Sequence, residues 1–225
     1  MAKYSRIEVF LKMKETGMVP LFYNPDAEVC KKMAKACYDG GARAFEFTNR
    51  GEFAQEVFKE LSLFAKAELP GMAVGVGSIV DAGTTSMYIQ LGADFIVSPI
   101  MNPEMAKVCN RRKILWSPGC GTLSEINQAE ELGCELVKIF PAEQIGGPAF
   151  VASIKAPCPW TDIMPSGGVT PEYDNIKAWF KAGATCVGMG SQLMKKSYYT
   201  DNKYDELAVK VKETIELIQK IKSEL

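Results

Sequence analysis

Residues 26–48, DAEVCKKMAKACYDGGARAFEFT, contain the pattern that decides the fold. Asp26 is a suitable N-cap for a helix over 27–38, and Gly40-Gly41 end that helix. The apolar segment 44–48 has the length and composition of a buried strand. The phrase that joins them, Gly-Gly-Ala-Arg-Ala, has counterparts before later strands: Leu-Gly-Ala-Asp-Phe, Leu-Gly-Cys-Glu-Leu and Ala-Gly-Ala-Thr-Cys. A helix followed by a strand is therefore the repeating unit of the chain.

Eight short apolar segments are expected to be strands, and they begin roughly 20 to 28 residues apart. They cover 19–23, 44–48, 72–76, 95–98, 115–118, 136–140, 162–165 and 186–189. Eight βα units in 225 residues predict an α/β fold of the (β/α)8 TIM barrel type. Because no low-complexity linker divides the chain, residues 1–225 are expected to form a single barrel domain.

Further helix signals fill the gaps between these strands. Thr122 and Glu125 form a capping-box pattern, and a second helix is expected from Pro171 to Ala182. An extra N-terminal helix is expected over about 4–16, covering the barrel bottom, and a C-terminal helix over about 204–224.

Composition narrows the function. A formal net charge of −1 gives no electrostatic reason to expect nucleic acid or an anionic membrane as a partner. No apolar run has the length of a membrane helix, no signal-peptide pattern is present, and the seven cysteines include no C-x-x-C pair. A cytoplasmic protein is expected. Because the chain has no histidine, acid–base or covalent chemistry must use Lys, Glu, Asp, Cys or Tyr.

Lys138 is the most unusual residue, because it is the only lysine within an apolar, β-branched, strand-like run. Strand alternation places Val137 and Ile139 toward the helices and Lys138 toward the interior. Desolvation favours the neutral amine, which can attack a ketone to form an iminium. The alternative is a structural lysine whose ammonium reaches the strand end or pairs with a carboxylate.

Glu46 repeats this anomaly between Phe45 and Phe47, and alternation places Arg50 on the same side. Glu46 could transfer protons, and the Arg50 guanidinium could bind a substrate carboxylate. The alternative is a structural ion pair of Glu46 with Lys138 or with Arg50.

Two glycine turns follow the last two strands, where barrels commonly bind phosphate. They are Ser166-Gly167-Gly168 and Gly188-Met189-Gly190-Ser191, and tight-turn geometry is the alternative explanation. Cys120, in Pro118-Gly119-Cys120-Gly121-Thr122, has no histidine to activate it and is expected in a pocket wall.

Taken together, these motifs resemble the 2-keto-3-deoxy-6-phosphogluconate (KDPG) / 4-hydroxy-2-oxoglutarate (KHG) aldolases from Val19 to Ser191. Glu46-Phe47-Thr48-Asn49-Arg50 is similar to E-x-T-x-R, and Lys138-Ile139-Phe140-Pro141-Ala142-Glu143 to K-x-F-P-A-E. Val76-Gly77-Ser78, Ser98-Pro99 and Pro118–Thr122 resemble further family motifs. The resemblance implies a class I lyase of the Entner-Doudoroff pathway that forms a Schiff base, uses no cofactor or metal, and is a homotrimer.

The resemblance also implies roles for individual residues. Lys138 would be the nucleophile and Glu46 the proton shuttle. The substrate, a phosphorylated 2-keto acid, would be bound by Arg50, Ser78, Pro99, Thr122, Phe140, Ser166, Gly167, Gly168, Gly190 and Ser191. KDPG would give pyruvate and glyceraldehyde 3-phosphate, and 4-hydroxy-2-oxoglutarate would give pyruvate and glyoxylate.

This sequence departs from the usual family pattern at positions that bear on substrate recognition. Ser78 and Ser166 replace the threonines usual in the family, and Tyr23-Asn24 stands where several members carry an arginine. Three alternatives remain: an aldolase for the 6-phosphogalactonate epimer, which Arg50 disfavours; a phosphosugar isomerase or synthase, which leaves Lys138 unexplained; and a non-catalytic phosphosugar-binding barrel.

Overall fold

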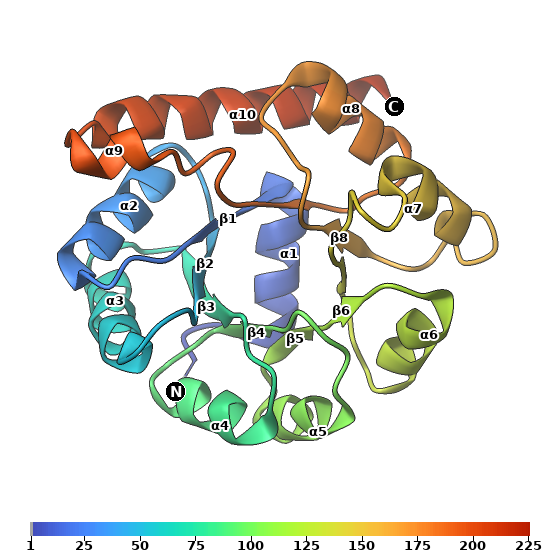
Figure 1. Ribbon diagram of the computed structural model, residues 1–225, viewed down its shortest axis with the longest axis horizontal. Helices are drawn as coiled ribbons and strands as arrows, with labels where there is room; N and C mark the ends of the chain where they lie inside the picture. The colour runs from blue at the N-terminus through green and yellow to red at the C-terminus, as the bar shows by residue number, and fades with distance from the viewer. Residues whose placement is uncertain (1) are drawn as a thin grey trace.

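The structure is a computed structural model that describes residues 2–225. Met1, the first residue of the expected domain, lies outside the described residues. Parallel strands and helices alternate along the chain, and the strands curl around a common centre with helices outside them (Figure 1). The protein thus has an α/β, TIM-barrel-like fold with a curled parallel sheet. Within residues 2–225, no helix has the length and apolar character needed to cross a bilayer.

The strands form two hydrogen-bonded groups, in the orders β5-β4-β3-β2-β1-β9 and β6-β7-β8. Their bounds are β1 Met18–Phe22, β2 Ala44–Thr48, β3 Ala73–Gly77, β4 Phe95–Val97, β5 Leu115–Ser117, β6 Gly119–Cys120, β7 Val137–Ile139, β8 Ile163–Pro165 and β9 Val187–Met189. All eight predicted strands are present, and no end differs by more than one residue. Pro118, which has no N–H to donate, separates β5 from β6. A bridge between Ser166 and Gly188 connects the ends of β8 and β9.

The helices lie mostly between successive strands. Their bounds are α1 Arg6–Thr16, α2 Ala27–Asp39, α3 Ala54–Glu68, α4 Ala82–Gln90, α5 Pro103–Arg112, α6 Leu123–Glu131, α7 Gly147–Lys155, α8 Tyr173–Lys181, α9 Lys196–Thr200 and α10 Tyr204–Glu224. The short α9, between β9 and α10, was not predicted from the sequence.

The capping predictions were largely confirmed. The Asp26 side chain accepts a hydrogen bond from the Glu28 N–H at 2.8 Å and begins α2. The Thr122 hydroxyl accepts from the Glu125 N–H at 3.2 Å, but the Glu125 carboxylate accepts from the Gly121 N–H instead of completing the expected capping box. The predicted start of α8 at Pro171 was wrong, since the helix begins at Tyr173.

Two apolar clusters fill the molecule. The larger lies between the strands and the surrounding helices and includes Val137 and Ile139. The smaller contains the inward-facing strand residues Val19, Ala44, Ala73, Phe95, Val97, Leu115, Leu136, Met164 and Cys186. Val9 and Met13 of α1 belong to this inner cluster, so α1, which precedes the first strand, packs against the interior of the curled sheet (Figure 1).

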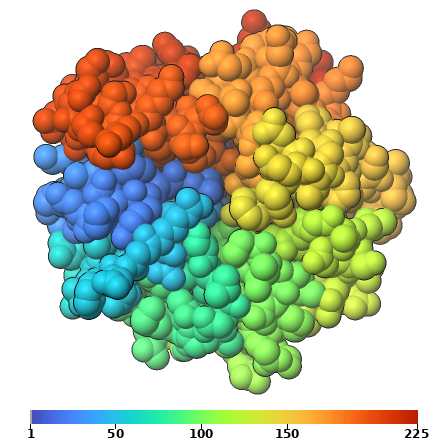
Figure 2. Space-filling model, in the orientation of Figure 1, coloured from blue at the N-terminus to red at the C-terminus, as the bar shows by residue number. Residues whose placement is uncertain are grey.

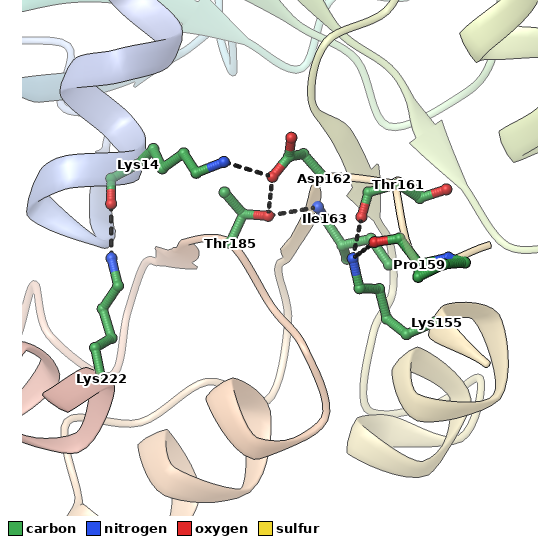
Figure 3. A network of polar contacts seen from close by, with 8 residues as sticks. All are labelled: Lys14, Lys155, Pro159, Thr161, Asp162, Ile163, Thr185 and Lys222. Carbon is green, nitrogen blue, oxygen red and sulfur yellow. Dashed lines mark hydrogen bonds and ion pairs between the residues drawn. The ribbon is translucent and has the colours of Figure 1, made fainter. Parts of the chain in front are cut away.

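A polar network ties the first and last helices to the starts of β8 and β9 (Figure 3). The Lys222 ammonium of α10 donates to the Lys14 carbonyl at 2.7 Å, and Lys14 forms an ion pair with Asp162 at 3.4 Å. The Thr185 hydroxyl donates to the Asp162 carboxylate at 2.7 Å and accepts from the Ile163 N–H at 3.1 Å. Because the network lies at the N-terminal ends of the strands, where residues of such folds serve stability, we assign it to the structural framework.

Candidate active site

A cavity of about 370 Å³ opens where the strands end. Segments at or after the ends of β1, β2, β7, β8 and β9 line it, so residues from 21–50 and from 140–199 border it together (Figure 2). Seven predicted site residues line this cavity: Arg50, Phe140, Ser166, Gly167, Gly168, Gly190 and Ser191. Arg50 is the one cationic side chain in the lining. The strand ends therefore bring together residues that are up to about 140 positions apart in the sequence.

Lys138 and Glu46 lie deeper than this lining. Lys138 is 5% exposed and Glu46 is 1% exposed. Each precedes a lining residue by two positions: Lys138 precedes Phe140, which directly follows β7, and Glu46 precedes Thr48, the last residue of β2. Leu136 packs in the inner cluster while Val137 and Ile139 pack in the outer one, which confirms that Lys138 faces inward.

Neither the Lys138 ammonium nor the Glu46 carboxylate forms a close ion pair within residues 2–225. Among residues 2–225, no carboxylate lies within 4.0 Å of the Lys138 ammonium, and no cation lies within that distance of the Glu46 carboxylate. The Lys138 ammonium lies 5.1 Å from the centre of the Phe140 ring. The structural ion pair considered for Glu46 is thus absent from the described residues.

The Glu46 carboxyl is placed to exchange a proton. Burial raises the pKa of Glu46 above its ordinary value, and the charges of Lys138 and Arg50 oppose this rise. Its Oε2 atom is buried and has no hydrogen-bond partner among residues 2–225. A side chain at Gly77 would collide with this carboxylate, so the glycine provides its space.

Arg50 and Ser78 meet at the ends of β2 and β3. The Arg50 Nε–H donates to the Ser78 hydroxyl at 3.4 Å. The neighbouring Asn49 is held on two sides: its N–H donates to the Gly77 carbonyl at 2.9 Å, and its side chain accepts from the Tyr88 hydroxyl at 2.8 Å. These contacts position a guanidinium and a hydroxyl side by side above Glu46.

The two glycine turns present unused backbone donors. Within residues 2–225, the N–H groups of Gly168, Val169, Ser191 and Gln192 have no acceptor among the hydrogen bonds of turns, loops and caps. Asn175 fixes the first turn by accepting from the Thr170 N–H at 2.9 Å and donating to the Gly168 carbonyl at 3.0 Å. Clustered free N–H groups are typical of an anion site.

Four expected pocket residues lie outside the lining. Ser78, Pro99 and Thr122 do not line the cavity, although Ser78 contacts Arg50, and the Thr122 hydroxyl is occupied in capping α6. Cys120, also expected in the wall, is buried outside the lining. Burial, with smaller contributions from Glu125 and Glu130, raises the pKa of its thiol to about 12, so it stays protonated near neutral pH.

Several lining residues were not predicted as site residues, among them Tyr23, Gln192, Met194 and Tyr199. Tyr199 lies on α9 and packs edge-on against Phe22, with ring centres 5.5 Å apart. A signal existed in Tyr198-Tyr199, an aromatic pair that begins seven residues after Ser191, the end of the second glycine turn.

Known proteins share this arrangement of sequence and fold. The family model described as KDPG and KHG aldolase matches residues 9–210. The 2-dehydro-3-deoxy-phosphogluconate aldolase of Haemophilus influenzae is 28% identical over 216 residues, covering 96% of this chain and 99% of that protein. The KHG/KDPG aldolase of Escherichia coli K12 is 28% identical and covers 88% and 91% of the two chains.

Among solved structures, the 2-keto-3-deoxy-6-phospho-gluconate aldolase of Zymomonas mobilis superimposes with a TM-score of 0.79 at 26% identity. The match covers 91% of this chain and 96% of that one. Since the family model spans most of the sequence, including both interior charges and both glycine turns, the chain belongs to the KDPG and KHG aldolase family.

Proposed function

We propose that this protein is a class I aldolase that cleaves KDPG to pyruvate and glyceraldehyde 3-phosphate through a Schiff base on Lys138. The observation that carries the proposal is a lysine that faces the barrel interior, is 5% exposed, and has no carboxylate of residues 2–225 within 4.0 Å. An amine that no carboxylate engages is available as a nucleophile toward a keto carbon. The same site would accept 4-hydroxy-2-oxoglutarate, giving pyruvate and glyoxylate.

The strand register relates Lys138 to Glu46. In a closed eight-stranded barrel, alternate strands contribute four side chains to each interior layer. We infer such a (β/α)8 TIM barrel, with α1 as the extra N-terminal helix and residues 1–225 as a single domain. Its register then gives one layer composed of Glu46, Val97, Lys138 and Gly188. Glu46 and Lys138 are the two charged members of this layer.

In the proposed reaction, the Lys138 amine attacks the C2 keto carbon of the substrate and forms a carbinolamine. Glu46 donates a proton to the leaving hydroxyl, so water departs and an iminium forms. The Glu46 carboxylate then removes the proton of the C4 hydroxyl. The C3–C4 bond breaks, the aldehyde leaves, and the electron pair moves to the iminium nitrogen as an enamine. Protonation at C3 and hydrolysis release pyruvate and the free amine.

The raised pKa of Glu46 suits both roles, since the group must donate and accept a proton near neutral pH. Arg50 and Ser78 would hold the substrate carboxylate by charge-assisted hydrogen bonds, and their mutual bond at 3.4 Å supports this assignment. Phe140, beside Lys138 and in the cavity lining, would contact the pyruvyl part. The proposed roles of Pro99 and Thr122 rest on the family resemblance alone.

The phosphate would occupy the two glycine turns. The N–H groups of Gly168, Val169, Ser191 and Gln192 would bind it together with the hydroxyls of Ser166 and Ser191, since all of these residues line the cavity. Ser166, Gly167 and Gly168 would bind it from one turn, and Gly190 and Ser191 from the other. Backbone N–H groups can bind a phosphate dianion without a positively charged side chain beside it.

Other properties are proposed from the family resemblance. The enzyme would need no cofactor or metal, because the iminium itself withdraws electrons. It would be a cytoplasmic homotrimer, with a small 2-keto acid phosphate as its ligand and no nucleic-acid or membrane partner.

Reduction with borohydride in the presence of pyruvate, followed by peptide mass analysis, tests the proposal. A pyruvyl adduct on the peptide that contains Lys138 is the expected result. Lys138→Met should abolish it, whereas Lys155→Met should retain it, because Lys155 binds the Pro159 and Thr161 carbonyls at the other end of the barrel (Figure 3). A folded wild-type protein without an adduct would refute the Schiff-base mechanism. Parallel assays with KDPG, its galactonate epimer and 4-hydroxy-2-oxoglutarate would then rank the substrates.

A further inference from the structure

Ser117 presents a buried hydroxyl to the barrel interior. It is 0% exposed, and its Oγ atom has no hydrogen-bond partner among residues 2–225. Other buried polar atoms share this property, but only Glu46 Oε2 and Ser117 Oγ come from inward-facing positions of the strands. Leaving a buried hydroxyl unpaired is unfavourable, so a ligand or a water molecule is expected to bind it.

The register shows on which side of Ser117 a polar partner can lie. Ser117 pairs with Val97 on β4, and it precedes Gly119, the partner of Lys138, by two residues. Its own interior layer contains Val19, Gly75 and Met164. The next layer toward the strand starts contains Ala44, Phe95, Leu136 and Cys186. Neither layer contains a charged side chain that could pair with Ser117.

The layer on the other side of Ser117 is the one that contains Lys138 and Glu46. Neither of them makes a direct hydrogen bond with Ser117, which would require 3.5 Å or less. Polar groups that face one another at greater separation are commonly bridged by water, provided that the water has two to four partners. Ser117 Oγ, Glu46 Oε2 and the Lys138 amine provide three.

We propose that Ser117 is a positioning residue that holds a water molecule against Lys138 and Glu46, and that this water hydrolyses the iminium. The inference rests on the proposed Schiff-base function and goes beyond it by assigning the water step. Ser117 contacts neither substrate carbon nor the lysine directly, so it acts through the water.

Hydrolysis converts the pyruvyl iminium to pyruvate and the free Lys138 amine. The water oxygen bonds to C2 of the pyruvyl iminium, and the electron pair of the C=N double bond moves to nitrogen. Glu46 takes one proton of the water, which leaves a carbinolamine. The carbinolamine C2–N bond then breaks, the carbinolamine hydroxyl becomes the keto oxygen, and the nitrogen leaves as the neutral Lys138 amine with the proton that the hydroxyl gives up. Dehydration to the iminium is the reverse sequence, so one water site serves both directions.

Pyruvate alone tests this assignment, in buffered D2O enriched in oxygen-18. Each return of the iminium to pyruvate by hydrolysis places oxygen-18 at C2, whereas each visit to the enamine places deuterium at C3. Mass spectrometry gives the ratio of the two labels. In Ser117→Ala, slower hydrolysis prolongs the lifetime of the iminium, so more deuterium is incorporated for each oxygen-18. The ratio of deuterium to oxygen-18 should rise about three- to tenfold, because the loss of one hydrogen bond typically slows a step by this factor.

Thr161→Val is the matched control. Thr161 is 1% exposed and its hydroxyl also lacks a partner, but it lies just before β8, at the barrel end far from the cavity (Figure 3). Its label ratio should equal that of the wild type. Ser117→Thr keeps the hydroxyl and should restore the wild-type ratio, while Ser117→Cys, a weak donor of similar size, serves if the alanine variant does not fold.

An unchanged ratio in folded Ser117→Ala or Ser117→Cys would overturn the assignment, as would an equal rise in Thr161→Val. Wild-type enzyme that incorporates neither label would overturn the Schiff-base function and this inference with it. This outcome is distinguishable from a failure of the Ser117 assignment alone, because it is seen in the wild-type enzyme before any substitution is made.

Discussion

The Glu46 carboxylate of β2 lies directly against Gly77 of β3, in the space that any side chain at position 77 would occupy. Glu46 is 1% exposed, so it has little room to move aside. The position of this carboxylate, the proposed proton-transferring group, therefore depends on the absence of a side chain at position 77 of the neighbouring strand.

Gly77→Ala should displace Glu46 and reduce aldolase turnover by at least about tenfold, since a misplaced proton donor loses most of its contribution. The melting temperature should fall as well, because the added methyl overpacks the interior. Gly83→Ala is the control: it lies in α4, where the nearest atom would be 3.2 Å away, and its turnover should stay unchanged. Normal turnover in Gly77→Ala would mean that Glu46 can act from another position.

Arg50→Gln should move the acid limb of the pH profile to higher pH. The Arg50 charge lowers the pKa of Glu46, so its removal raises that pKa, and the carboxylate form is then lost at a higher pH. A shift of up to about one pH unit is expected. Deuterium exchange at C3 of pyruvate, measured at saturation across the pH range, reports it. Arg111→Gln, an exposed change in α5, should leave the profile in place; a shift to lower pH in Arg50→Gln would contradict the argument.

Ser191→Ala should weaken binding of the phosphorylated substrate without affecting Schiff-base formation. Ser191 lines the cavity beside free backbone N–H groups, and a hydrogen bond to an ionised group contributes about 1.5–3 kcal/mol. The KM for KDPG should thus rise at least about tenfold, while the adduct with unphosphorylated pyruvate forms at the wild-type rate. An equal loss in both assays would place Ser191 elsewhere in the mechanism. Ser153→Ala, an exposed hydroxyl on α7, is the control.

Thr185→Val should destabilise the fold and leave the kinetics intact. The hydroxyl both donates to Asp162 and accepts from the Ile163 N–H, so its loss leaves that N–H unpaired and leaves the Asp162 carboxylate with Lys14 alone (Figure 3). The free energy of unfolding in urea should fall by about 1–3 kcal/mol. Thr200→Val, on the exposed α9, should change it by less than about 0.5 kcal/mol. A large loss of turnover in Thr185→Val would show that the two ends of the barrel are coupled.

Local signals were sufficient for the strands and for the interior residues. Lys138 and Glu46 stand out because a charge within an apolar, alternating run has few structural explanations, and alternation alone gives their direction. The glycine turns follow from their place after the last strands. These inferences need only near neighbours in sequence.

What the sequence does not show has a common cause in tertiary context. Thr122 has the residue type of a substrate contact, yet its hydroxyl is used by the helix that it caps. Tyr199 reaches the cavity only because α9, a helix of five residues, packs beside β1. The partnerless state of Ser117 depends on which side chains the other strands place around it, and no local pattern encodes this.

A cavity with Arg50 as its one cationic side chain, in a chain of net charge −1, has little means of attracting an anion from a distance. Backbone dipoles act within a few ångströms and are little screened at contact, whereas steering by net charge falls off over a Debye length. The rate of substrate capture should consequently vary little with ionic strength, and discrimination between anions should follow their shape more than their charge.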